Sequence, residues 1–174
     1  MEQIWTNTFK NVKLTPYRLI AAGAGVSKTL LPDGTEMGAS DLKRELGYCQ
    51  LFAWNAESKE LQAWNKYLQE HPECKCDLVV DSGAYSAWSK GKKFDIDEYI
   101  DYLNANKLID TCFWAAEADV IPGSFGVDPT EEERLAAPEK SWENYLYMID
   151  RVRYPKKIVP IFHMGEDYKH LLRM

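Results

Sequence analysis

The sequence predicts an α/β protein built on a parallel sheet, because short apolar runs alternate along the chain with segments of helical periodicity. One such run, Leu78-Val79-Val80, is short and wholly apolar, as expected of a strand that is buried on both faces. The runs with the length and composition of strands are 17–22, 48–54, 78–80, 111–116 and 158–162. The 174 residues can bury a sizeable core, so we expect residues 1–174 to form a single α/β domain.

The helical segments begin at residues that favour helix starts. Asp95 and Glu98 have the spacing of a capping box in which an aspartate is the N-cap residue, and Thr130 and Glu133 repeat that spacing. Apolar residues follow both pairs at helical intervals. We therefore predict helices that begin just after Asp95 and just after Thr130.

Proline sets the expected end of the second of these helices. Pro138 has no backbone N–H, so we expect the helix to end there. Ser141 can then cap a separate helix. A further helix is predicted over about 59–69.

The spacing of the strands favours a barrel. Five strand–helix units in 174 residues correspond to about 35 residues for each unit, and eight such units would need roughly 280, near the usual size of a (β/α)8 barrel. We therefore expect a TIM-barrel-like fold of which this chain carries about five of the eight βα units, as its N-terminal part. A smaller open α/β sheet is the alternative.

Composition limits the classes of partner. The net charge of −6 and the pI of about 5.2 exclude a strong overall attraction to nucleic acid or anionic lipid. Lys90, Lys92 and Lys93 form one local basic cluster and residues 151–157 form another, and we interpret both as solvated surface charge. No apolar run approaches ~18 residues and the N-terminus is no signal peptide, so we expect a cytoplasmic protein with no membrane partner.

Two motifs with possible chemistry are set aside. Cys74-Lys75-Cys76 lacks a fourth ligand at a suitable spacing, so no metal site is assigned. The segment 23–29 is similar to a phosphate-binding P-loop, but Ala22 and Ser27 stand where that loop needs glycine. A glycine turn that lines a crevice is the better interpretation.

Polar clusters follow three successive predicted strands. They are 81–83, the pair Glu117 and Asp119, and 163–166. Because the carboxyl ends of parallel strands lie at one edge of a sheet, we expect these clusters to face a common crevice. A carboxylate such as Asp81 can act there as a general base or hold a polar substrate edge, although an aspartate in this position can also simply cap a turn.

The other two clusters also have both a functional and a structural interpretation. Glu117 and Asp119 are two residues apart and point to one side of an extended chain, so they can share a site in which one pKa is raised. The alternative is a pair of ordinary loop acids. His163 is followed by Gly165 and Glu166. Its place at the same edge as carboxylates favours a functional role over a purely structural one.

Four segments together resemble one family. They are Asp81-Ser82-Gly83-Ala84-Tyr85-Ser86, Asp95-Ile96-Asp97-Glu98-Tyr99-Ile100, Asp119-Val120-Ile121 and Pro160 to Glu166. In this order and at this spacing they resemble the tRNA-guanine transglycosylases, and most closely the phage and bacterial relatives that insert 7-deazaguanines into DNA. The resemblance runs from about residue 18 to the end of the chain.

The resemblance implies base exchange at a guanine of a nucleic acid through a covalent ribosyl–enzyme intermediate. It implies that Asp81 lies at the reacting nucleoside, that Tyr85 stacks on the base and that Asp119 reads the polar edge of the base. His163 and Gly165 would lie in the base-binding turn, where the transglycosylases have Gln in place of His. We therefore take Asp81 as the candidate catalytic residue, and the candidate substrate-binding residues are Ser82, Gly83, Tyr85, Glu117, Asp119, His163, Gly165 and Glu166.

The resemblance also implies which functional residues of the family are not in this chain. The nucleophilic aspartate and the zinc-binding cysteines of the family would fall beyond Met174, so we identify no cofactor within this chain and expect it to be inactive unless a second polypeptide or an oligomer completes the barrel. The implied ligands are a purine or 7-deazaguanine base and DNA or tRNA. The implied setting is the cytoplasm of a bacterial or phage-infected cell.

Two other functions fit the same residues. A glycoside hydrolase barrel could use Asp81, Glu117 and Asp119 as acid and base, with carboxyl groups about 5–5.5 Å or 6.5–9.5 Å apart. A non-catalytic module could keep the pocket and bind a purine without turnover.

Overall fold

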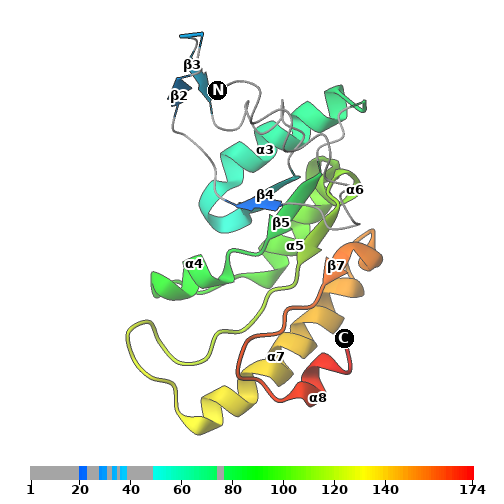
Figure 1. The fold of residues 1–174 in the computed structure, drawn as a ribbon. Coiled ribbons are helices and arrows are strands. Elements are labelled where there is room, and N and C mark those ends of the chain that lie inside the picture. Colours follow the sequence, from blue (N-terminus) through cyan, green and yellow to red (C-terminus); the bar gives the residue numbers. More distant parts are fainter. Residues whose placement is uncertain (1–19, 23–27, 31–32, 35, 39–48, 74–76) are drawn as a thin grey trace, which may run out of the picture.

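A parallel sheet of five strands forms the centre of the structure (Figure 1). The computed structural model describes residues 20–22, 28–30, 33–34, 36–38, 49–73 and 77–174. Within them the sheet has the order β1-β4-β5-β6-β7 and every neighbouring pair is parallel. The strands are β1 (Ile20–Ala22), β4 (Cys49–Ala53), β5 (Leu78–Asp81), β6 (Trp114–Ala116) and β7 (Ile158–Val159), and β2 (Lys28–Leu30) and β3 (Glu36–Gly38) form a separate antiparallel pair. The predicted α/β class with a parallel sheet is confirmed.

Helices fill the connections between the parallel strands. Asp95 accepts hydrogen bonds from the N–H groups of Asp97 and Glu98, both at 3.1 Å, and Thr130 forms a complete capping box with Glu133, so both predicted helix starts are confirmed. The described helices are α3 (Trp54–Glu70), α4 (Ala84–Ser89), α5 (Ile96–Asn104), η1 (Ala105–Lys107), α6 (Leu108–Thr111), α7 (Glu131–Ile149), η2 (Pro155–Lys157) and α8 (Tyr168–Leu171). The helix predicted over 59–69 lies inside α3.

The predicted helix end at Pro138 is wrong. Helix α7 runs without interruption from Glu131 to Ile149, and both Pro138 and Ser141 lie on its buried face. Proline in a helix interior removes one hydrogen bond and costs about 3 kcal/mol, and burial of this long helix against the sheet outweighs that cost. The hydroxyl of Ser141 caps no helix, because it accepts a hydrogen bond from the N–H of Val120 at 2.8 Å.

Two strands are shorter than predicted, for local reasons. The run 111–116 begins as the end of α6, where the Thr111 hydroxyl donates to the carbonyl of Lys107, so β6 begins only at Trp114. Strand β7 ends at Val159 because Pro160 has no N–H to donate to a neighbouring strand.

The core lies between one face of the sheet and the helices. Leu78 and Val80 of β5 are fully buried in it, against Leu61 and Trp64 of α3 and Tyr99 of α5. Successive side chains of a strand point to opposite faces, so Asp81 at the end of β5 points away from this helix-covered face. Figure 1 shows α7 running beside β7 and the long loop before α7 passing close to α4.

Some expectations fall wholly or partly outside the described residues. Cys74 and Cys76 are outside them, as are 17–19 of the first predicted strand and 23–27 of the glycine turn. Lys28 and Thr29 belong to β2, whereas a P-loop would continue into a helix there. Among the described helices, none is long and apolar enough to cross a membrane.

Replacing Ser141 by alanine tests the contact between α7 and the chain after β6. The substitution leaves the Val120 N–H without its acceptor, so we expect a loss of about 1–3 kcal/mol in the free energy of unfolding, measured by urea denaturation. Ser89→Ala is the matched control, because that hydroxyl bonds only the Ser86 carbonyl in its own short helix. Equal losses in the two variants would contradict the assigned role of Ser141.

Candidate functional site

The carboxyl ends of β5, β6 and β7 carry the polar residues that the sequence singles out. Asp81 is the last residue of β5, Glu117 and Asp119 follow β6, and His163 lies four residues beyond the end of β7. Since these strands are parallel neighbours, their carboxyl ends lie at one edge of the sheet. The predicted common edge is therefore present.

Asp119 joins the segments that follow three strands. Its Oδ1 atom accepts a hydrogen bond from the Ser82 hydroxyl at 3.2 Å, and its Oδ2 atom pairs with Nε2 of His163 at 3.0 Å. Ser82 follows β5, Asp119 follows β6 and His163 follows β7. One carboxylate thus connects residues that lie 37 and 44 positions away in the sequence.

His163 lies between two carboxylates. Its Nδ1 atom is 2.8 Å from Oε1 of Glu166, and its Nε2 atom faces Asp119. Hydrogen bonding to Asp119 raises the pKa of His163 from 6.5 to about 9, against the opposing effect of partial burial and with further help from Glu166. At neutral pH the ring is therefore a cation that donates from both nitrogens. Gly165 has a φ of 99° in the tight turn that returns Glu166 to the histidine.

Glu117 is completely buried beneath this edge. Its Oε1 atom accepts the N–H of Ile161 at 2.9 Å, which ties the segment after β6 to the one after β7. Burial raises the pKa of Glu117 to about 7; the Ile161 hydrogen bond opposes this shift and the charge of Asp119 adds to it. The carboxyl group of Glu117 is thus divided between its acid and carboxylate forms near neutral pH, as the sequence suggested for one member of this pair.

Two carboxylate oxygens near this edge lack a hydrogen-bond partner. They are Oε2 of Glu117 and Oε2 of Glu166, both buried, and within the described part of the chain no donor reaches either one. An unsatisfied buried acceptor is costly, so a ligand with N–H groups would be favoured beside them.

A glycine turn brings Ser82 into place after Asp81. Gly83 has a φ of 73°, and a Cβ atom built there would lie 2.8 Å from Cβ of Asn55 in the first turn of α3. Only glycine fits this close approach. The buried Ser82 hydroxyl accepts the N–H of Ala84 at 3.2 Å while it donates to Asp119.

Asp81 is half-buried, and its charge acts on the buried phenol of Tyr99. Tyr99 of α5 is fully buried and donates its hydroxyl to the carbonyl of Ala116 at 3.0 Å. Burial first, and then the charge of Asp81, raises the pKa of Tyr99 well above its usual value. Asp119 contributes in the same direction, so Asp81 and Asp119 both lie near this phenol.

Tyr85 lies at the rim of the site and not among the carboxylates. Its side chain is 60% exposed and its ring packs on Trp88, with 5.5 Å between ring centroids. Trp88 in turn contacts Phe125 edge-to-face at 5.4 Å and donates its indole N–H to the carbonyl of Gly123 at 2.9 Å. The aromatic rim of Tyr85, Trp88 and Phe125 therefore spans α4 and the loop after β6.

Sequence reasoning missed the residues that hold the Asp119 segment from behind. Asn144 of α7 donates to the Ala118 carbonyl at 2.6 Å, and the Ala118 N–H contacts Sδ of Met148 at 3.2 Å. Ser141, Asn144 and Met148 have the spacing of one helix face, a pattern that was hidden by ending the helix at Pro138.

The described residues contain no metal site. Among them no three His, Cys, Asp or Glu side chains are grouped so that they could hold a metal ion. His71, which precedes the Cys74 motif, pairs at 3.1 Å with the exposed Glu73.

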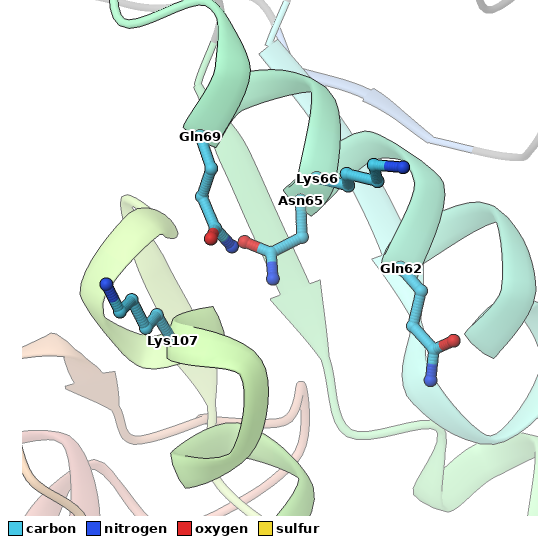
Figure 2. A pocket seen from close by; sticks show the side chains of 5 residues that line it. All are labelled: Gln62, Asn65, Lys66, Gln69 and Lys107. Atoms are coloured by element: carbon cyan, nitrogen blue, oxygen red, sulfur yellow. The ribbon is translucent and has the colours of Figure 1, made fainter.

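A cavity of about 380 Å³ lies on the helical layer, away from the carboxylates. Figure 2 shows that the residues lining it come from α3 and from the segment just before α6. They are Gln62, Asn65, Lys66, Gln69 and Lys107. None of the predicted site residues contributes to this cavity.

Comparison of the chain with protein-family models, curated proteins and solved structures finds no match. The geometry of the strand ends is therefore the basis for assigning a function.

Replacing Glu117 by glutamine tests the raised pKa of this buried acid. A carboxyl group whose pKa is raised on folding stabilises the protein most below its ordinary pKa of 4.5, and this stabilisation is lost as the pH rises through about 7. In Glu117→Gln the fall in unfolding free energy over this range should be smaller than in the wild type, by on the order of 2–3 kcal/mol.

Urea denaturation from about pH 4.5 to pH 7 measures this difference. Glu143→Gln, at an exposed position of α7, is the control and should keep the wild-type pH dependence. The same pH dependence in Glu117→Gln and in the wild type would show that folding does not perturb Glu117.

Proposed function

We propose that this chain contributes the base-binding half of a transglycosylase-like site, which exchanges guanine or a 7-deazaguanine in DNA or tRNA. The observation that carries the proposal is the double contact of Asp119 with Ser82 and His163. Through it, three of the segments that resemble the transglycosylases meet at one edge of a parallel sheet.

The chemistry of the edge suits a guanine-like ligand. Guanine presents N–H donors on its Watson–Crick edge, and carboxylates are the natural acceptors for them. Asp119 is held at this edge, and the unpartnered Oε2 atoms of Glu117 and Glu166 add acceptors close by. The cationic His163 donates to both Asp119 and Glu166 and so holds these two carboxylates at the edge.

Asp81 has the position expected of an acid/base group. It ends β5 beside Ser82, and its side chain lies on the opposite face of the strand from Leu78 and Val80, which pack in the core. In base exchange such a carboxylate would hold or move a proton as the base departs and its replacement arrives. The nucleophile that bonds to the sugar in the meantime is not assigned to any residue of this chain.

The strand order supports a barrel as the setting. Strands β4 to β7 neighbour one another in the order of the chain, as in a (β/α)8 barrel, whereas an open doubly wound sheet reverses its order at a switch point. We propose that the five strands form an arc of such a barrel, with the remaining strands supplied by a further segment or by another polypeptide.

Ligand-induced stabilisation tests the binding part of the proposal. Guanine should raise the melting temperature more than adenine, whose edge offers a different pattern of donors and acceptors. Asp119→Asn should weaken guanine binding by about tenfold or more, since a hydrogen bond to a charged group contributes about 1.5–3 kcal/mol. Glu143→Gln should bind guanine as the wild type does. Equal stabilisation by guanine and adenine would contradict a guanine-reading site.

An exchange assay tests the reaction itself. Because no residue of this chain is assigned as the nucleophile, the chain is assayed together with the segment or polypeptide that completes the barrel. Labelled guanine or 7-deazaguanine is incubated with this protein and either tRNA or DNA, and label in the nucleic acid is counted. Asp81→Asn should abolish incorporation while leaving the melting temperature of the unliganded protein close to that of the wild type. Guanine-specific stabilisation with no incorporation into either nucleic acid would favour the purine-binding module over the enzyme.

A further inference from the structure

The aromatic rim of Tyr85, Trp88 and Phe125 is a feature of the strand-end edge that the proposed base exchange does not use. Tyr85 and Phe125 are 60% and 59% exposed, although each ring contacts Trp88. Exposed aromatic rings that pack together beside a polar site are unusual on a surface that only faces water.

The rim is built to keep its shape. The indole N–H of Trp88 donates to Gly123, so a side chain of α4 is fixed to the loop after β6. That loop is closed by a hydrogen bond from the Val127 N–H to the Ser124 carbonyl at 3.0 Å, on either side of Phe125. The rings are thus held in place before any ligand arrives.

The rim also begins at the catalytic candidates. Tyr85 is four residues beyond Asp81, and Gly123 is four residues beyond Asp119. The rim is therefore close in the sequence to both carboxylates that the proposed function places at the base.

Three ammonium groups accompany the rings. Lys90, Lys92 and Lys93 are exposed and follow α4 in a turn that is closed onto it by hydrogen bonds from the N–H groups of Lys90 and Lys92 to Ala87. Within the described part of the chain, none of the three lysines lies within 4 Å of a carboxylate oxygen, as an ion pair would require.

The nearest acids on the chain are already engaged. Asp95 caps α5, and Asp97 accepts the hydroxyl of Tyr147 at 2.7 Å.

The other basic cluster, at 151–157, differs from this one. Arg153 pairs with Asp110 at 2.8 Å, and Lys157 donates to two backbone carbonyls. The three lysines beside the rim have no ion-pair partner among the described residues and are therefore available to an anionic partner.

We propose that the rim and its three lysines bind a single strand of nucleic acid, with bases stacked on the rings and phosphates at the ammonium groups. The inference rests on the proposed function in taking nucleic acid as the substrate, and it assigns Tyr85 to bases that flank the exchanged one. A single strand is the form that fits, because a duplex hides the faces of its bases in the stack and an enzyme that acts on a base must take it out.

Fluorescence anisotropy with a labelled oligothymidine of about 12 nucleotides tests the proposal. This probe has no guanine, so it reports the rim and not the guanine site. The wild-type protein should bind the single strand more tightly than its duplex with oligoadenine. Tyr85→Ala and Phe125→Ala should each weaken binding about fivefold or more, in line with the loss of one stacked base.

The salt dependence of binding tests the lysines. Replacing Lys90, Lys92 and Lys93 by glutamine should lower the slope of log affinity against log salt concentration by about 2, since each phosphate contact on a single strand contributes about 0.7. Tyr154→Ala and Lys156→Gln remove an exposed ring and an exposed charge beside β7, before that strand begins, and they should leave binding unchanged.

The outcomes separate this proposal from the proposed function. Wild-type affinity in Tyr85→Ala and Phe125→Ala, preference for the duplex, or an equal loss in the Tyr154 and Lys156 variants would overturn the single-strand surface. Loss of oligothymidine binding in the rim variants supports it whether or not base exchange is found. A protein that exchanges guanine but does not bind oligothymidine would keep the proposed function and refute this inference.

Discussion

The contact between Asp119 and His163 is the interaction on which the rest of the site depends. The 3.0 Å contact between Oδ2 of Asp119 and Nε2 of His163 connects the segments that follow β6 and β7. The other oxygen of Asp119 accepts from Ser82, which follows β5. A carboxylate between a hydroxyl and an imidazolium is well satisfied even where water is scarce. Glu117 also joins the segments after β6 and β7 through the N–H of Ile161, and Asp119 adds the segment after β5, so that the three form one surface.

That contact is possible because the chain around Asp119 is fixed from the opposite side. Ser141, Asn144 and Met148 of α7 contact the backbone at Ala118 and Val120, the residues on either side of Asp119. The backbone at Ala118 and Val120 lies beyond the end of β6, and its polar groups find partners in α7. The same helix therefore supplies both apolar packing and the polar support for the site, which explains why it continues through Pro138.

Most of the strands and helix starts could be predicted from the sequence because neighbouring residues determine them. The apolar run ending at Asp81 and the caps at Asp95 and Thr130 are decided by neighbouring residues, and parallel strands bring their ends to one edge whatever the details. The continuous α7 could not be predicted, because a proline rule describes an isolated helix and burial overrode it. The pairing of Asp119 with His163, and the packing of Tyr85 on Trp88 instead of among the carboxylates, join residues whose approach depends on the whole fold.

The most direct test of this account is the titration of His163 by NMR. The chain has three histidines, so the signal is assigned by its loss in His163→Gln. With both carboxylates in place the ring should titrate near 9, and Asp119→Asn should lower that midpoint because the larger of the two hydrogen-bonding causes is removed. Asp97→Asn, which alters an acid far along the chain, should leave the midpoint unchanged. A wild-type midpoint near 6.5 would show that His163 does not lie between the two carboxylates.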